Sequence, residues 1–198
     1  MRVSKALTDH DIQIAANALA VPVPAIKAIV SVESRGNGFI KDGRPAILFE
    51  RHVMRRRLKA KGIDTSKLEV EQPNVVNAIA GGYQGGTLEH DKLGQAAKID
   101  RDCALESASW GLLQIMGYHW KALGYDTLQQ FINAMYRSEG DQLDAFVRFV
   151  KADPSLWKAL KRLDWEEVAK RYNGPAYAKN QYDKKLADAF RRAGGGIA

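Results

Sequence analysis

Hydrophobic residues recur at helical spacing along most of this chain. The i, i+3, i+4, i+7 pattern of a single helix face occurs in three segments: Ile12/Ala15/Ala16/Leu19, Leu128/Phe131/Ile132/Met135 and Leu143/Phe146/Val147/Val150. A fourth set, Tyr182/Leu186/Ala189/Phe190, lines one face of the last predicted helix. The first segment follows Thr8 and Asp9, either of which suits a helix N-cap. A further short helix is expected from about Asp164 to Tyr172. The pattern therefore predicts a mainly α-helical protein.

One predicted helix is apolar on nearly every side. Pro22 and Pro24 interrupt the chain, and Pro24 suits the first turn of a helix that runs over residues 25–35. Only Lys27 and Ser31 mark a narrow polar strip along it. A helix of this composition is expected to be buried in the protein interior.

Two stretches lack helical spacing. Residues 36–50 contain three glycines, one proline and the apolar run 46–49, which predicts a short strand or β-hairpin. Residues 79–86 are glycine-rich and predict a flexible loop of the kind that lines a cleft. No repeat, low-complexity tract or linker divides the 198 residues, so we expect one domain over residues 1–198.

Composition limits the compartments in which the chain is expected to be made and to fold. Cys103 is the only cysteine, so no intrachain disulfide can form. No apolar run approaches the ~18 residues of a membrane span, and residues 1–11 lack the apolar core of a secretory signal. We expect synthesis in the cytoplasm and export, if any, by another route.

The chain carries a net charge of +7, from 30 Lys and Arg against 23 Asp and Glu. Such a surface favours polyanions, which include nucleic acid, anionic lipid and the polymers of a bacterial envelope. The densest basic run, residues 51–61, has no interleaved aromatic residues for base stacking, and its charges spread over a broad helix face. This favours a solvated surface over a nucleic-acid site.

Glu33 is the first candidate for chemistry. It lies seven residues after Ile26 and four after Ile29, and therefore on the apolar face at the C-terminal end of the predicted helix. Burial and the negative end of the helix dipole both raise a carboxyl pKa there, as proton donation to a glycosidic bond requires. The alternative is that Glu33 frays outward into solvent.

Glu50 is the second candidate. It follows the apolar run 46–49, where a buried strand would end and its side chain could enter a cleft. Two carboxylates facing each other across a cleft are typical of glycoside hydrolysis. An ion pair with Arg44 or Arg51 is the alternative.

The sequence patterns of zinc sites, serine or cysteine hydrolases and phosphate-binding sites are missing. The four histidines show no zinc-ligand spacing, no serine stands in a Gly-x-Ser-x-Gly frame, and Cys103 has no papain-like context. No phosphate-binding loop is present. We therefore expect neither a metal nor a cofactor.

Several segments together resemble one superfamily of glycosidases. Residues 32–34 (Val-Glu-Ser), 109–116 (Ser-Trp-Gly-Leu-Leu-Gln-Ile-Met) and 171–175 (Arg-Tyr-Asn-Gly-Pro) are similar, in this order, to motifs of goose-type lysozymes and lytic transglycosylases. The Gly-rich turn after Glu33 and residues 48–52 (Leu-Phe-Glu-Arg-His) resemble more closely the N-acetylmuramidase domain of phage and prophage endolysins. The resemblance runs over residues 25–189.

This resemblance implies a lysozyme-like helical fold and cleavage of the β-1,4 bond between N-acetylmuramic acid and N-acetylglucosamine in peptidoglycan strands. It implies that Glu33 is the catalytic acid and Glu50 the second carboxylate. Substrate-binding candidates share a predicted place in the cleft, and they are Gln114, Tyr172, Asn173, Tyr83 and Trp110. The two last are proposed because aromatic faces suit sugar stacking, although burial is the default for a tryptophan.

Two departures from related proteins shape the expected function. In transglycosylases no second carboxylate follows on a strand, so Glu50 favours a hydrolase over an enzyme that forms 1,6-anhydro products. Many endolysins of this kind begin with a peptidoglycan-binding module, and we expect none here. A lytic transglycosylase and an inactive wall-binding module remain the alternatives.

The resemblance also implies where the protein acts. We expect a monomer that reaches periplasmic peptidoglycan through a holin-type pore. The basic last helix, residues 179–192, could disturb an anionic outer membrane. Its apolar stripe, however, is more typical of a face that packs on the core.

Overall fold

The computed structural model describes residues 5–34 and 37–196. In chain order its helices and strands, with η for a 3-10 helix, are α1 (Asp9–Leu19), α2 (Val23–Glu33), β1 (Ile47–Phe49), α3 (Arg51–Ala60), α4 (Ser66–Glu71), α5 (Thr87–Ile99), α6 (Arg101–Glu106), β2 (Ala108–Trp110), β3 (Ile115–Met116), η1 (Gly117–His119), α7 (Leu128–Arg137), α8 (Glu139–Ala152), α9 (Pro154–Lys161), α10 (Trp165–Asn173), η2 (Pro175–Tyr177) and α11 (Tyr182–Arg192). The prediction of a mainly helical protein is confirmed.

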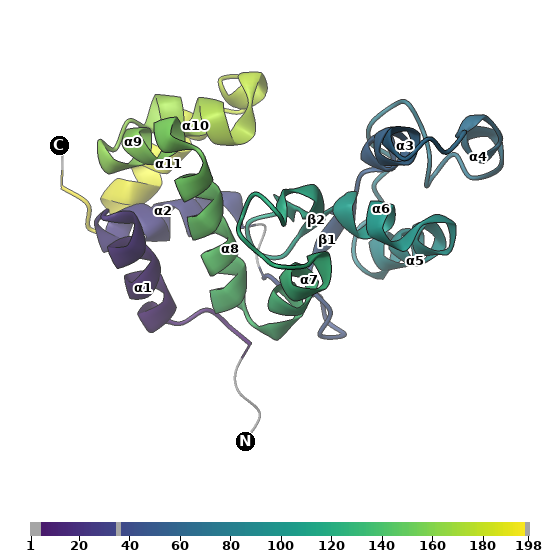
Figure 1. Ribbon diagram of the computed structural model, residues 1–198. Helices are drawn as coiled ribbons and strands as arrows, with labels where there is room; N and C mark the ends of the chain where they lie inside the picture. The colour runs from purple at the N-terminus through teal and green to yellow at the C-terminus, as the bar shows by residue number, and fades with distance from the viewer. Residues whose placement is uncertain (1–4, 35–36, 197–198) are drawn as a thin grey trace.

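The helices form two groups with the small sheet between them (Figure 1). In one group, α2 packs against α1 and α11, α10 lies between α9 and α11, and α8 contacts α1 and α9. In the other, α6 packs against α3 and α5, and α5 also contacts β1. The end of α2 and strand β1 both lie near the junction of the two groups (Figure 1).

The predicted helices form where their capping residues and stripes place them. Thr8 caps α1 through a reciprocal capping box with Asp11, and Asp164 caps α10. The helix expected over residues 25–35 begins at Val23, with Pro24 in its first turn, and ends at Glu33. Its expected end at Arg35 lies outside the described residues.

The prediction of a short strand within residues 36–50 is confirmed. A strand does form at Ile47–Phe49, but its partner is β2, with Ile47 opposite Trp110, and β2 pairs in turn with β3. Among the described residues of 36–50, the local pairing is a single bridge between Phe39 and Pro45. Strands of two or three residues are too short to show a period of two in the sequence.

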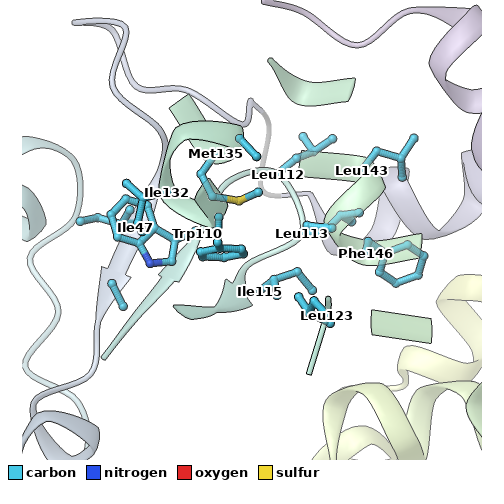
Figure 2. Close-up of a cluster of buried hydrophobic side chains, with 14 of the residues drawn as sticks. Ile47, Trp110, Leu112, Leu113, Ile115, Leu123, Ile132, Met135, Leu143 and Phe146 are labelled. Carbon is cyan, nitrogen blue, oxygen red and sulfur yellow. The ribbon is translucent and has the colours of Figure 1, made fainter. Parts of the chain in front are cut away.

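One large cluster of buried side chains joins both helix groups and the sheet, and part of it lies between the sheet, α7 and α8. Figure 2 shows Trp110 among the buried side chains of Ile47, Ile132 and Met135. The indole is 1% exposed, and its Nε1 donates a hydrogen bond to the Leu105 carbonyl oxygen at 3.1 Å. This residue therefore belongs to the packing of the sheet on the helices.

The stripe on α11 also faces the interior. Leu186, Ala189 and Phe190 are buried, and α11 packs on α2. The interpretation of this stripe as a core-facing seam is therefore confirmed. No single helix of the described part of the chain is long and apolar enough to span a membrane; α1 and α2 together have the required length and composition, but they are bent by 113°.

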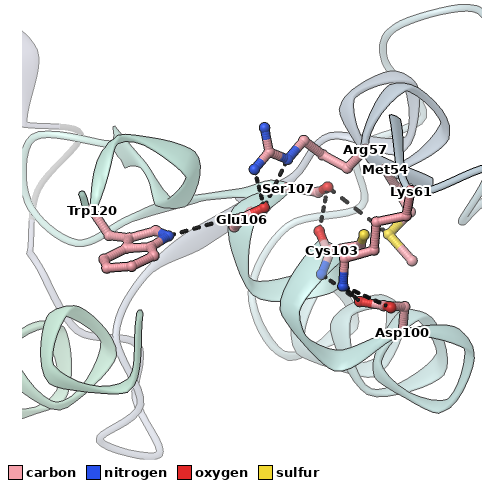
Figure 3. Close-up of polar contacts among 8 residues, drawn as sticks. All are labelled: Met54, Arg57, Lys61, Asp100, Cys103, Glu106, Ser107 and Trp120. Carbon is pink, nitrogen blue, oxygen red and sulfur yellow. Dashed lines mark hydrogen bonds and ion pairs between the residues drawn. The ribbon is translucent and has the colours of Figure 1, made fainter. Parts of the chain in front are cut away.

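The basic helix α3 is held by internal ion pairs (Figure 3). The Arg57 guanidinium pairs with Glu106, and Lys61 Nζ lies 2.9 Å from both carboxylate oxygens of Asp100. Glu106 also accepts a hydrogen bond from Trp120 Nε1 at 3.0 Å. Part of the basic run therefore fastens α3 to α6, instead of forming the free solvated charge that its pattern predicted.

Candidate active site

Glu33 is the last residue of α2 and lies on the same face as Ile29. Its side chain is half-buried, with a small apolar cavity behind it that Ile29 and Phe146 help to line. Burial raises the pKa of Glu33 by more than the hydrogen bond from Asn173 and the positive charge of Lys185 lower it. The alternative in which Glu33 frays into solvent is wrong.

Asn173 and Tyr172, at the end of α10, form the wall next to Glu33. Asn173 Nδ2 donates to both Glu33 carboxylate oxygens, at 3.2 and 3.1 Å, and its buried Oδ1 has no partner among the described residues. The Tyr172 hydroxyl donates to the Leu113 carbonyl oxygen at 2.6 Å. Burial, with a smaller effect from the Glu33 charge, raises the pKa of Tyr172, so its hydroxyl remains a donor.

Glu50 stands directly after β1 and is the N-cap residue of α3. The alternation of the strand buries Ile47 and Phe49 and leaves Leu48 and Glu50 on the cleft side. The Glu50 side chain is 16% exposed. The Tyr83 hydroxyl donates to its two carboxylate oxygens at 2.8 and 2.9 Å.

Neither arginine considered as an ion-pair partner contacts Glu50. Arg44 pairs with Asp42 at 2.7 Å, and the Arg51 guanidinium donates to backbone carbonyl oxygens, among them that of Ile79 at 2.9 Å. The basic side chain near Glu50 is His52, whose Nδ1 lies 3.3 Å from Glu50 Oε2. The Glu50 carboxylate therefore remains directed toward the cleft.

The two carboxyl groups line one cavity of about 380 Å³. Gln114, Tyr172 and Asn173 line it as well, so five of the seven residues singled out in the sequence surround the same space. The cavity shares Leu48 and Gln114 with a second groove of about 930 Å³, which extends over Phe39 and Gly86. Together they form a long open cleft.

Gln114 stands where the two cavities meet. Its backbone has φ = 51°, in the left-handed region, and its Nε2 donates to the Gly111 carbonyl oxygen at 2.8 Å. Its Oε1 accepts from the Ser109 hydroxyl at 2.8 Å. The buried side chain of Gln142 holds the same turn by accepting from Leu112 N at 2.7 Å.

Of the two aromatic residues predicted to contact the sugar, Tyr83 lies at the site and Trp110 does not. Tyr83 is 47% exposed and reaches the site through its bond to Glu50. Trp110 presents no face to a sugar, because it is 1% exposed, and its predicted place in the cleft is wrong. Its position on β2 turns the ring toward the core, while the neighbouring Ser109 bonds to Gln114.

Sequence reasoning missed four aromatic residues that line the cavity of Glu33 and Glu50: Tyr118, His119, Phe149 and Tyr182. The His119 ring lies between Tyr118, at 4.3 Å, and Phe149, at 5.2 Å. Burial lowers the pKa of His119, so the ring is neutral. The available signal was the position of Tyr118 and His119 immediately after the motif segment 109–116.

The arrangement can donate a proton from one side of the cleft and hold negative charge on the other. Glu33 has the raised pKa of a proton donor, whereas Glu50, across the cleft, accepts hydrogen bonds from the Tyr83 hydroxyl. Among the described residues, no group of three or more His, Cys, Asp or Glu side chains could hold a metal ion.

The chain is similar to known proteins over nearly all of its length. The model of a family described as "Muramidase: N-acetylmuramidase" matches residues 22–194. A solved structure, described as the crystal structure of a Burkholderia AP3 phage endolysin, shares 49% sequence identity with a TM-score of 0.92. That match covers 98% of this chain and 74% of the other. No curated protein sequence matches the chain.

Proposed function

The chain belongs to the N-acetylmuramidase family, and from this premise we propose that its cleft hydrolyses the β-1,4 bond between N-acetylmuramic acid and N-acetylglucosamine in peptidoglycan. The observation that carries the proposal is the single cavity that joins Glu33 to Glu50. Glu33 has the raised pKa of an acid, and Glu50 lies in a polar setting with Tyr83 as donor. Two carboxyl groups in unlike environments are what this reaction needs.

Glu33 protonates the glycosidic oxygen as the bond to the sugar breaks. The apolar cavity behind it disfavours its charged form, so Glu33 holds its proton at a higher pH than a solvated glutamate does. Asn173 fixes the plane of the carboxyl group through its two contacts. General acid catalysis of this kind contributes about 10²–10⁴-fold in rate.

Glu50 acts on the side of the breaking glycosidic bond that lies opposite Glu33. As the leaving group departs, positive charge develops on the sugar ring, and a nearby carboxylate stabilises it or removes a proton from the attacking water. The Tyr83 hydroxyl bonds both Glu50 oxygens and so restricts the rotation of the carboxylate. Either role gives a hydrolysed product with a free reducing end.

Other residues of the cleft hold the glycan strand. The free Oδ1 of Asn173 is placed to accept a hydrogen bond from a sugar N–H or from water. Gln114 and Tyr172 shape the wall on either side of Leu113. The groove of about 930 Å³ continues from Gln114 and has room for further sugar units.

We propose an endolysin role for this activity, as one catalytic domain that works as a monomer. The substrate is periplasmic peptidoglycan, reached through a holin-type pore. The net charge of +7 supports attraction to the anionic envelope, including the outer-membrane surface.

Mass spectrometry of digested peptidoglycan tests the proposed reaction. We expect muropeptides with reducing ends. Anhydro-muropeptides would identify a lytic transglycosylase instead. A protein that sediments with the wall but releases no fragments would be a binding module.

A further inference from the structure

Glu89 and Lys92 form the most deeply buried ion pair of the described residues. Their side chains are 0% and 5% exposed, and Lys92 Nζ lies 2.9 Å from Glu89 Oε1. Both stand on α5, outside the residues that line the cleft. Burying two charges is costly, so a pair of this kind is weak evidence for stability by itself. The hydrogen bonds of the pair to nearby backbone groups indicate a role in positioning instead of stability.

The pair ties the strand before Glu50 to the segment of residues 79–86, here called the glycine loop. Glu89 Oε2 accepts from Phe49 N at 2.9 Å, while its Oε1 accepts from Gln84 N at 2.7 Å and Gly85 N at 3.2 Å. Lys92 Nζ donates to the Gly82 carbonyl oxygen at 2.5 Å. Although burial raises the pKa of Glu89, these donors hold it below its usual value, so Glu89 is ionised.

The residue after Glu50 is bound to the same loop. Arg51 donates to the Ile79 carbonyl oxygen at 2.9 Å, and its guanidinium lies against Gly82, where an added Cβ would be 3.1 Å from Nη1. The residues on both sides of Glu50 are therefore fastened to the glycine loop. From the middle of that loop, Tyr83 donates to the Glu50 carboxylate.

We propose that Glu89 and Lys92 are positioning residues that hold Tyr83 against Glu50 and thereby fix the Glu50 carboxylate in the cleft. The glycine loop has positive φ at Gly81, Gly82, Gly85 and Gly86, and its conformation depends on such anchors. A small misplacement of a catalytic group costs rate without weakening substrate binding. This inference rests on the role proposed above for Glu50.

The test compares Tyr83→Phe, Lys92→Met and the neutral double variant Glu89→Gln/Lys92→Met. Reducing-end release from soluble, uncross-linked peptidoglycan strands gives kcat and KM separately. We expect each change to lower kcat by about tenfold and to leave KM within about twofold. Because the pair acts through Tyr83, adding either pair variant to Tyr83→Phe should lower kcat by no more than about twofold further.

Tyr177→Phe is the matched control, since it removes a Tyr–Glu hydrogen bond of 3.0 Å to Glu166 away from the cleft. It should retain parental kcat. Lys92→Met changes one residue and leaves the three backbone donors to Glu89 in place, so its kinetics are the test if the double variant does not fold. Folded pair variants with parental kcat, or losses that multiply with that of Tyr83→Phe, would overturn the inference. A parental protein that releases no reducing ends would instead overturn the proposed function.

Discussion

Asn173 Nδ2 donates hydrogen bonds to both carboxylate oxygens of Glu33, at 3.2 and 3.1 Å. The two residues are the last of α10 and of α2, so the contact joins the ends of two helices that are 140 positions apart in the chain. The bond favours the carboxylate, whereas the burial of Glu33 favours the acid and is the larger effect. The pKa of Glu33 is thus set by burial, which raises it, against the Asn173 amide and the positive charge of Lys185, which lower it.

Removing this amide should move the pH profile. Asn173→Ala deletes a donor that lowers the pKa of Glu33, so the pKa of Glu33 rises further. A catalytic acid loses activity as pH rises through its pKa, and the basic limb of kcat/KM against pH therefore shifts to higher pH. Asn133→Ala, on the exposed side of α7, is the control and should leave the profile in place. A basic limb that is unmoved, or moved downward, would contradict the assignment.

Loss of the acid itself should remove activity. Glu33→Gln keeps the shape of the side chain but cannot donate the proton, so kcat should fall by at least about 100-fold. The measurement is lysis of outer-membrane-permeabilised cells, with reducing-end release from purified peptidoglycan in parallel. Glu71→Gln, an exposed change on α4, should behave as the parent. Lysis by Glu33→Gln at the parental rate would show that the acid lies elsewhere.

The same substitution should stabilise the fold. Because burial raises the pKa of Glu33, the folded state binds its proton more tightly than the unfolded chain does. Its contribution is therefore fully present below the unfolded pKa and is lost as pH rises through the folded pKa. Glu33→Gln avoids that loss, so its Tm should exceed the parental Tm at neutral pH, by roughly 2–4 °C per kcal/mol gained. Thermal melts across pH test this: the advantage should vanish in acid, and a constant advantage would refute it.

Glu50 should matter less than Glu33 if it acts mainly through its charge. Glu50→Gln retains an oxygen that can accept from Tyr83 but removes the negative charge. We expect kcat to fall by about tenfold or more, yet by less than in Glu33→Gln. Reducing-end assays on both variants measure the difference. Parental kcat in Glu50→Gln would exclude Glu50 from the reaction.

The sequence pattern drew attention to Glu33 and Glu50 because each stands at a point where a regular pattern ends, and the motif resemblance then favoured a catalytic role for both. Glu33 interrupts the apolar face of a helix, and Glu50 follows a buried strand. Asn173 required the motif resemblance, because its contact with Glu33 depends on how α10 packs against the other helices. Local patterning carries no information about such a long-range contact.

The pairing of the short strands and the aromatic residues of the cleft could not be predicted from sequence patterns either. β2 and β3 are too short for a period of two to appear, so the partner of β1 could not be predicted. Tyr118 and His119 lie on a 3-10 turn, which has no hydrophobic stripe of its own. Trp110 and Ser109 are neighbours on β2, but Trp110 packs in the core and Ser109 bonds to Gln114 in the cleft. Composition alone does not distinguish the two faces of a strand.

Trp110 should therefore behave as a core residue in every assay. Trp110→Phe shrinks a side chain that is 1% exposed and leaves the Leu105 carbonyl oxygen without its donor, so stability should fall by on the order of 1–3 kcal/mol. Because the ring does not face the cleft, KM for peptidoglycan strands should stay at the parental value while the protein is folded. Denaturant unfolding and steady-state kinetics measure the two effects separately. A raised KM with unchanged stability would mean that Trp110 contacts the glycan after all.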